Sequence, residues 1–425
     1  MNRSITVSII GAGSSYTPEL IDGFLGFDPA RLPVAEFRLF DVHAERLGVM
    51  AGLAGRMVRR HGRPIAVKTC TRLEEALEGA DFVITQIRVG GMHARWLDES
   101  IPLKYGILGQ ETTGPGGMFK ALRTIPAMLE IARAVERVAP QAFILNYTNP
   151  SGIVTEAVTR HTGAKILGLC SGIPLIIEEI KKDFGADYPG LHAYCVGLNH
   201  LGFIHRIVSG GKDVIGEIIE RMAARTSRHG KDADALNQFA VEIGAIPIGY
   251  LDYYFRRGRL VKKLQAQEKT RAQQIMELEK AVFAEAAAPG ADQKPETLGK
   301  RGGGGYSSVT FAAMDALYND TGEELAISVP NQGTVDGIEA DEVVEVVCRI
   351  GRNGATPIPV GPIPLAFRGL VHAVKAYEVL TVEAAMTHDR RLLKQALLNH
   401  PLVGDAEIID PMLDELIAAH GLWKE

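Results

Sequence analysis

The chain has 425 residues, 46% of them hydrophobic, and a formal net charge of −5. This length is more than one ordinary core needs, so we expect two lobes. The weak negative charge and the lack of a long basic block exclude the electrostatic footprint of a nucleic-acid partner. No apolar stretch approaches the roughly 18 residues of a membrane span, and the first predicted strand leaves no room for a signal peptide after Met1. We therefore expect a cytoplasmic globular enzyme.

Short β-branched runs alternate with helical patterns through the first 170 residues. The predicted strands span residues 5–10, 37–40, 65–67, 82–87, 143–145 and 166–169, and the helical patterns between them include residues 44–61, 73–77 and 122–138. This alternation is typical of a doubly wound parallel sheet. We predict a Rossmann-like α/β domain over residues 1–172 and a second domain over residues 173–425.

The opening strand runs directly into a Gly-x-Gly turn, GAGSSYTPEL. Gly11 and Gly13 permit a tight turn and the close approach of a pyrophosphate, and the helix N-terminus that follows would face its charge. Tyr16 stands where a third glycine would complete the fingerprint. Asp41 ends the next strand, where a carboxylate would bind a ribose diol and repel a 2′-phosphate. The sequence predicts an NAD site, although the 30 residues from Gly11 to Asp41 exceed the roughly 20 of compact units.

Polar side chains follow several later strands, at the carboxyl edge where open α/β sheets bind ligands. They are Arg88, Arg95, Glu111, Asn146 and Asn149. Surface solvation or loop capping could explain any one of them alone. Together they suit a hydroxyl-rich substrate.

Cys70, Cys170, Cys195 and Cys348 lack paired spacing, which argues against a disulfide framework. We expect three of them to be buried thiols, but Cys170 ends the apolar run ILGLC, and His200 in GLNHLGF has a similar setting. A thiol and an imidazole at the mouths of buried strands could share one metal ion and leave positions open for substrate or water. A buried thiol and a capped histidine are the simpler alternative.

Tyr250, Tyr253 and Tyr254 cluster in IGYLDYYF, a pattern more typical of packing than of chemistry. A tyrosine near a cation could nonetheless act as a base. Farther on, the charged segment 262–288 has helical spacing, and the glycine run at 301–307 is either a flexible surface loop or backbone that approaches a ligand closely. Proline and glycine density at 351–364 predicts a loop before the final helices.

A series of motifs closely resembles those of the family four glycoside hydrolases: GSSYTPEL, IPLKYG with GQETTGPGG, NYTNPSG, GLNHLGF and TRAQQIM. The resemblance extends through NHPLV near the end of the chain and is strongest to the 6-phospho-β-glucosidases of that family. It implies a lactate/malate dehydrogenase-like α+β domain after the Rossmann-like sheet. It also implies a homo-oligomer, either a dimer or a tetramer.

The resemblance implies a redox route to hydrolysis of a sugar with an anionic C6 group. NAD takes hydride from C3, and the resulting ketone acidifies the proton on C2. A base removes that proton, a divalent metal stabilises the enediolate, the C1 substituent is eliminated, water adds, and the hydride returns.

Site residues follow from the resemblance by position. The implied NAD contacts are Gly11, Gly13, Ser14, Ser15 and Asp41, the metal ligands are Cys170 and His200, and the base is Tyr250. The implied substrate residues are Arg88, Arg95, Glu111, Asn149, Ser171 and Arg271. The family implies manganese, whereas a thiolate ligand alone would favour zinc.

One departure from the family pattern follows Cys170. This chain has Ser171-Gly172-Ile173-Pro174, where the phospho-β-glucosidases usually have Asn-Val-Pro and α-specific members carry an acid. A small hydroxyl residue argues against an α-type acid and reshapes the sugar pocket. Because arginine can bind a sulfonate as well as a phosphate, a sulfoquinovosidase with the same mechanism is an alternative.

Two further functions stay open at the level of sequence. A 2-hydroxy-acid dehydrogenase would share the architecture, but it needs a histidine and aspartate pair as a proton relay, and we find no convincing pair. A non-catalytic NAD-binding sensor would retain the pocket. The presence of Cys170, His200 and Tyr250 argues against both.

Overall fold

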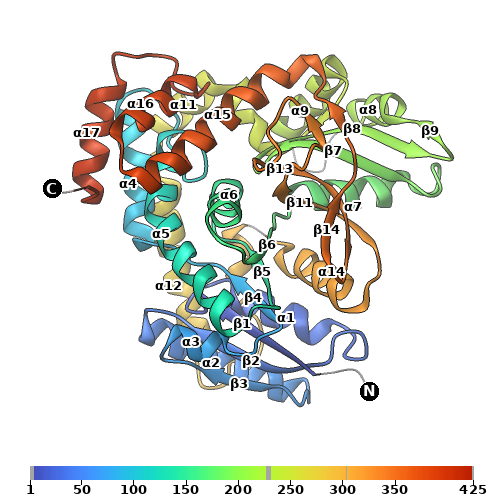
Figure 1. The fold of residues 1–425 in the computed structure, drawn as a ribbon, viewed down its shortest axis with the longest axis vertical. Helices are drawn as coiled ribbons and strands as arrows, with labels where there is room; N and C mark the ends of the chain where they lie inside the picture. Colours follow the sequence, from blue (N-terminus) through green and yellow to red (C-terminus); the bar gives the residue numbers. More distant parts are fainter. Residues whose placement is uncertain (1–3, 226–230, 303, 424–425) are drawn as a thin grey trace.

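The computed structural model describes residues 4–225, 231–302 and 304–423. Its centre is a nine-stranded sheet with the order β14-β13-β11-β6-β5-β4-β1-β2-β3 (Figure 1). Six strands come from the first part of the chain: β1 Ile5–Ile10, β2 Val34–Phe40, β3 Ala66–Thr69, β4 Phe82–Thr85, β5 Phe143–Asn146 and β6 Lys165–Gly168. These six pair in parallel, which places their carboxyl ends along one edge.

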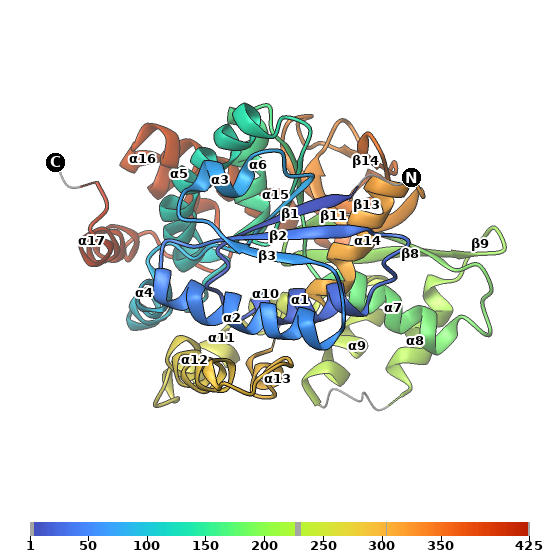
Figure 2. The same ribbon diagram turned by 90° about the horizontal axis from the view of Figure 1, so that it is seen from below.

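Helices cover both faces of this sheet (Figure 2). On one face lie α1 Thr17–Gly26 and α2 Ala44–Arg60, and on the other lie α3 Leu73–Leu77, α5 Gly114–Val138 and α6 Ser151–His161. α4 Gly91–Lys104 packs against α5, and α7 Gly172–Phe184 follows β6. The predicted doubly wound α/β sheet is therefore confirmed.

The second part of the chain extends the same sheet. β11 Glu323–Pro330 pairs antiparallel with β6, and β13 Val343–Gly351 and β14 Gly354–Pro357 follow outward. Because the sheet runs across residue 172, the domain division at that point stays a prediction. A separate four-stranded sheet contains β7 His192–Leu198, β8 Leu201–Ser209, β9 Lys212–Asp213 and β10 Ile246–Pro247, and β12 Val335–Asp336 pairs with β15 Gly361–Pro362.

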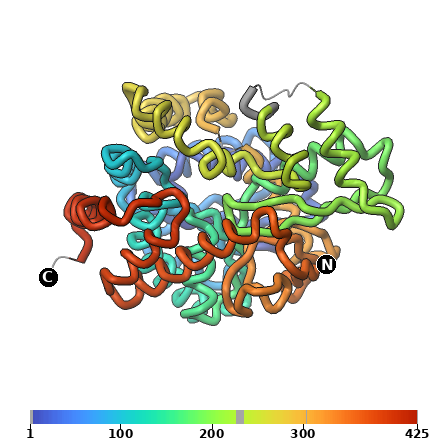
Figure 3. Tube along the Cα trace, turned by 90° about the horizontal axis from the view of Figure 1, so that it is seen from above, coloured from blue at the N-terminus to red at the C-terminus, as the bar shows by residue number. Residues whose placement is uncertain are grey.

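Helices of the second part pack around these sheets. They are α8 Ile215–Ala223, α9 Lys231–Ile243, the 3₁₀ turn Gly249–Leu251, α10 Asp252–Phe255, α11 Arg257–Gln265, α12 Arg271–Ala287, α13 Leu298–Arg301, α14 Tyr306–Asn319, α15 Leu365–Thr387, α16 Arg390–Asn399 and α17 Ile409–His420. The C-terminal helices lie beside the N-terminal half, with α15 against α5 and α17 against α4 (Figure 3). Within the described ranges, no helix combines the length and apolar character that a membrane crossing requires.

Two sequence predictions need correction. The single helix over 262–288 is wrong because α11 ends at Gln265 and α12 begins at Arg271, where Thr270 and Gln273 form a reciprocal capping box. The loop over 351–364 is wrong in part because Gly354, with φ of +114°, turns β13 back into β14. The prediction that Cys70, Cys195 and Cys348 are buried free thiols is confirmed.

Candidate active site

The Gly-x-Gly turn leads from β1 into α1 and lies against the ends of two neighbouring strands. Gly11 has φ of +87°, and a Cβ there would meet the Gln86 carbonyl oxygen at 2.8 Å. A Cβ on Gly13 would lie 2.8 Å from Asp41 Oδ2, the same oxygen that accepts a hydrogen bond from the Gly13 N–H. Both positions therefore require glycine, and Asp41 fixes the turn to the end of β2.

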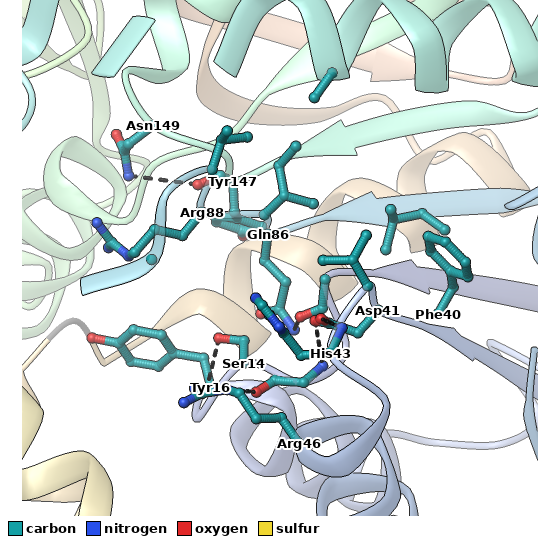
Figure 4. Close-up of a pocket in the computed structure, with 18 of the residues that line it drawn as sticks. Ser14, Tyr16, Phe40, Asp41, His43, Arg46, Gln86, Arg88, Tyr147 and Asn149 are labelled. Atoms are coloured by element: carbon teal, nitrogen blue, oxygen red, sulfur yellow. Dashed lines mark hydrogen bonds between the residues drawn. The ribbon is translucent and has the colours of Figure 1, made fainter. Parts of the chain in front are cut away.

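A cavity of about 740 Å³ opens above this turn (Figure 4). Of the residues predicted from the sequence, Gly11, Gly13, Ser14, Asp41, Arg88 and Asn149 line it. Ser15 lies outside the lining, and its buried hydroxyl donates to Glu279 at 2.9 Å. In Figure 4 Asn149 lies at the upper left of the labelled group, near Arg88, and Asp41 lies on its right side.

A buried cluster of charges joins Arg88 to α4 and α5. Glu111 accepts hydrogen bonds from Arg88 and from Lys120 Nζ at 2.7 Å, and Arg95 Nη1 lies 2.8 Å from its other oxygen. Burial opposes ionisation of Glu111, but Arg88, Lys120 and Arg95 hold its pKa well below the usual range. Burial, and next the charge of Arg88, lowers the pKa of Lys120 to about 7. The structure therefore brings Arg88, Arg95 and Glu111 together, as a carboxylate held between cations.

A second group of predicted site residues lies outside the cavity lining and contains Cys170, His200 and Tyr250. Cys170 follows β6, and His200 lies in the β7–β8 turn with φ of +65°. The ring centroids of His200 and Tyr250 are 4.1 Å apart. The pKa of Tyr250 is raised, mainly by burial and secondly by the charge of Cys170. The same charge acts on Tyr147 and Tyr306, which line the cavity. A Cβ on Gly152, three residues after Asn149 of the lining, would lie 3.3 Å from the Cβ of Asn199, which precedes His200, so the two groups are neighbours.

The donors of this second group are unusual for a protein interior. Burial raises the pKa of the Cys170 thiol to about 12, and burial followed by the charge of Lys120 lowers that of His200 to about 4. His200 Nδ1 is buried and has no hydrogen-bond partner among the described residues. A neutral imidazole with an unused nitrogen near a thiol fits a divalent transition metal. Within the described ranges, no set of three or more His, Cys, Asp and Glu side chains is placed to hold a metal ion.

Two further predicted substrate residues lie apart from the cavity lining, as Arg95 and Glu111 also do. Ser171 is the N-cap residue of α7 and is half-buried. Arg271 opens α12, where its guanidinium donates to the Arg301 carbonyl at 2.7 Å and to Gln274 Oε1 at 3.3 Å. Sequence reasoning missed Lys120 and Arg301, both in the lining. The only local signal for Arg301 was the glycine run after it, and Lys120 gave none.

A glycine turn beneath a cavity at the carboxyl ends of parallel strands defines a Rossmann-type α/β protein. Comparison with protein families is more specific. The family 4 glycosyl hydrolase model matches residues 6–186, and the model of its C-terminal domain matches residues 195–403. The chain belongs to the family 4 glycosyl hydrolases.

Curated relatives match along the whole chain. A probable 6-phospho-β-glucosidase of Bacillus subtilis is 39% identical over 99% of this chain and 97% of its own length. The 6-phospho-β-glucosidase of Escherichia coli is 36% identical over 100% of this chain and 97% of its own length. A structure of the 6-phospho-β-glucosidase of Thermotoga maritima with manganese, NAD⁺ and glucose 6-phosphate superposes with a TM-score of 0.90, at 33% identity and 99% coverage of both chains.

Proposed function

We propose that this protein hydrolyses 6-phospho-β-glucosides with the help of NAD and manganese. The observation that carries the proposal is the meeting of the glycine-turn cavity with the buried group Cys170, His200 and Tyr250. The names of the Bacillus and Escherichia relatives support the substrate class. The Thermotoga structure, which contains manganese, NAD⁺ and glucose 6-phosphate, supports the cofactors.

The residues present fit both cofactors. Gly11 and Gly13 would hold NAD because, without a Cβ, they let the turn pack closely on Gln86 and Asp41 at the cavity wall, and Asp41 would face the ribose. Cys170 and His200 would hold the metal through the thiol and the unused Nδ1. When bound, NAD accepts and returns a hydride, and the metal polarises sugar oxygens.

The chain's own side chains bind the sugar and move its proton. We assign Tyr250 Oη as the acceptor of the C2 proton because its ring lies against His200. Asn149 lines the cavity and offers an amide to a sugar hydroxyl, while Arg88 and Arg95, held in place by Glu111, favour an anionic substrate. Tyr147 and Tyr306 are aromatic wall residues that limit water. Substrate contacts by Ser171 and Arg271 and a cofactor contact by Ser15 stay predictions, as do a homo-oligomer and a cytoplasmic location.

A panel of para-nitrophenyl β-glycosides tests the proposal. The panel carries 6-phosphate, 6-sulfonate, a uronate carboxylate or a free hydroxyl, and each member is assayed with NAD and Mn²⁺ and with either one omitted. We expect release of para-nitrophenol from the 6-phosphate member alone, and only when both cofactors are present. Preference for the sulfonate would support the sulfoquinovosidase alternative, and hydrolysis of the neutral glycoside would contradict an anion-selective site.

A further inference from the structure

The glycine run at 301–307 places a buried arginine at the cavity wall. Arg301 is the last residue of α13, lines the cavity and has a side chain only 5% exposed. Its guanidinium carbon lies 4.1 Å from the centroid of the Tyr16 ring, and Tyr16 Oη donates to the carbonyl of Gly302. The chain can leave α13 at this point because Gly302 has φ of +78°. The guanidinium is therefore fixed by the turn that follows it.

Arg301 has donors that the protein does not use. Its Nη2 lies 3.1 Å from Glu279 Oε1. Its Nε and Nη1 are buried, and neither has a hydrogen-bond partner among the described residues. Buried donors on a charged group are costly to leave without an acceptor. The geometry therefore calls for an acceptor in the cavity.

The surroundings of Arg301 carry more positive than negative charge. Glu279 also pairs with Arg46 at 3.4 Å and accepts from Ser15, so two guanidinium groups share one carboxylate. Burial lowers the pKa of Arg301, and the charges of Arg88 and Arg95 lower it further. Tyr16 and Glu279 act in the opposite direction and raise it, but the net shift is downward. Positive charges that lower one another's affinity for protons favour an anion between them.

Contacts of Arg301 connect it to the sugar end of the cavity. Tyr16, which lies under its guanidinium, packs against Tyr306 with ring centroids 5.2 Å apart, and Tyr306 packs against Tyr147 at 4.7 Å. The charge of Cys170 acts on two of these three tyrosines, Tyr147 and Tyr306. Asp41, by contrast, is bonded to Gly13 and His43 at the ribose end.

We propose that Arg301 binds the phosphate at C6 of the sugar through Nε and Nη1 and makes the site selective for an anionic substrate. This inference rests on the proposed function and adds to it a phosphate-binding residue that the sequence motifs do not predict. The turn at Gly302 holds this guanidinium at the cavity wall.

Binding of two phosphate ligands tests the assignment. In the full-length protein, Arg301→Met removes the charge at nearly constant volume, Arg301→Lys keeps it, and Arg56→Met is the matched control. Arg56 is a partly buried arginine that donates to the backbone carbonyls of Ala286, at 2.6 Å, and Ala291, and it lies outside the cavity lining. Calorimetric titration would give the Kd of glucose 6-phosphate, with NAD and Mn²⁺ saturating, and the Kd of NAD alone.

We expect Arg301→Met to raise the Kd of glucose 6-phosphate by about 30-fold and Arg301→Lys by several-fold less, because a lysine lacks the fixed guanidinium donors. The Kd of NAD should change by less than about threefold in both, and Arg56→Met should match the parent protein. Weaker NAD binding with unchanged sugar-phosphate binding would overturn the inference in favour of the cofactor pyrophosphate. Unchanged binding of both ligands would also overturn it. If the parent protein itself neither binds glucose 6-phosphate nor cleaves the 6-phospho-β-glucoside, the proposed function fails as well.

Discussion

Asn199 connects the proposed metal ligands to a carboxylate in the interior. It precedes His200 in the β7–β8 turn, and its Nδ2 donates to Glu345 Oε2 at 2.9 Å. Its side chain also favours the charged form of the Cys170 thiol. Glu345 is 1% exposed on β13. One amide, in the residue next to His200, thus connects Cys170 to Glu345, as outer partners of metal ligands commonly do.

We therefore expect Asn199→Leu to weaken Mn²⁺ binding by about 10- to 100-fold. Glu345→Gln keeps an oxygen acceptor for the Asn199 amide and should retain most of the affinity. Titration with Mn²⁺, monitored by electron paramagnetic resonance at saturating NAD, gives the Kd of Mn²⁺ for each variant. An Asn199→Leu protein that binds Mn²⁺ as the parent does would exclude this positioning role.

Contacts between distant elements depend on His400 at the end of α16. Gly114 N–H at the start of α5 approaches His400 Nε2 at 3.2 Å, and Leu402 N–H approaches Nδ1 at 3.2 Å. Tyr377 of α15 and Tyr254 of α10 face the ring, with centroids 4.4 Å and 6.0 Å away, and Arg257 donates to the adjacent Pro401 carbonyl. A neutral imidazole accepts a hydrogen bond at one ring nitrogen and an imidazolium at neither, so protonation would remove the nitrogen that accepts from the backbone.

The fold should lose stability in acid because of this histidine. Burial lowers the pKa of His400 to about 3, whereas an unfolded histidine has a pKa near 6.5. Between these values the unfolded chain binds more protons, so the free energy of unfolding falls as pH falls, by at most about 1.4 kcal/mol per pH unit. Chemical denaturation at pH 7.5 and pH 5 should show a smaller pH-dependent loss in His400→Gln than in the parent. Equal losses in the two proteins would contradict this role.

Elements with a strong local pattern could be predicted from the sequence, and those fixed by a distant contact could not. β1 and β4 are apolar runs buried within the sheet, and their strand assignment is confirmed. The break before α12 was missed because the Thr270–Gln273 capping box lies inside a uniformly charged, helix-like pattern. Residues 266–270 separate the two helices, and the capping box marks the start of the second.

In the candidate site, too, residues required by a local pattern could be predicted and those that depend on distant contacts could not. Gly11 and Gly13 could be predicted because a tight turn needs them locally, and Asp41 because it follows the next strand; the structure shows the steric reason for each glycine. Arg301 could not be predicted, because its role depends on Glu279 and Tyr16, which are remote in sequence. Motif resemblance instead led to Arg271, which donates to the backbone of Arg301.

At the scale of the molecule, the C-terminal helix fixes the walls of the charged cluster. Asp98 of α4 pairs with Arg123 of α5 at 2.6 Å and with His420 of α17 at 3.0 Å, and all three side chains are buried. α4 and α5 also carry Arg95 and Lys120. Residues from the end of the chain therefore stabilise the position of side chains that surround Glu111.

The proposed reaction needs both parts of the chain to act on one sugar. Gly11 and Asp41 come from the first part, and His200 and Tyr250 come from the second. If C3 is oxidised and C2 deprotonated, the product regains its C2 hydrogen from solvent. We expect glucose 6-phosphate released in heavy water to carry deuterium at C2, with no net formation of NADH. Mass spectrometry would measure the deuterium in the product, and absorbance at the nicotinamide band would measure net NADH.

Tyr250→Phe should reduce kcat by at least about 100-fold, because it removes the proposed base, while the Kd of NAD stays within about threefold. Tyr188→Phe is the matched control, since Tyr188 Oη donates to Glu217 at 2.8 Å and lies outside the cavity lining. Product without label at C2 would exclude deprotonation at that carbon. Stoichiometric NADH would instead indicate a dehydrogenase, because a glycosidase that returns the hydride in each turnover cannot accumulate the reduced cofactor.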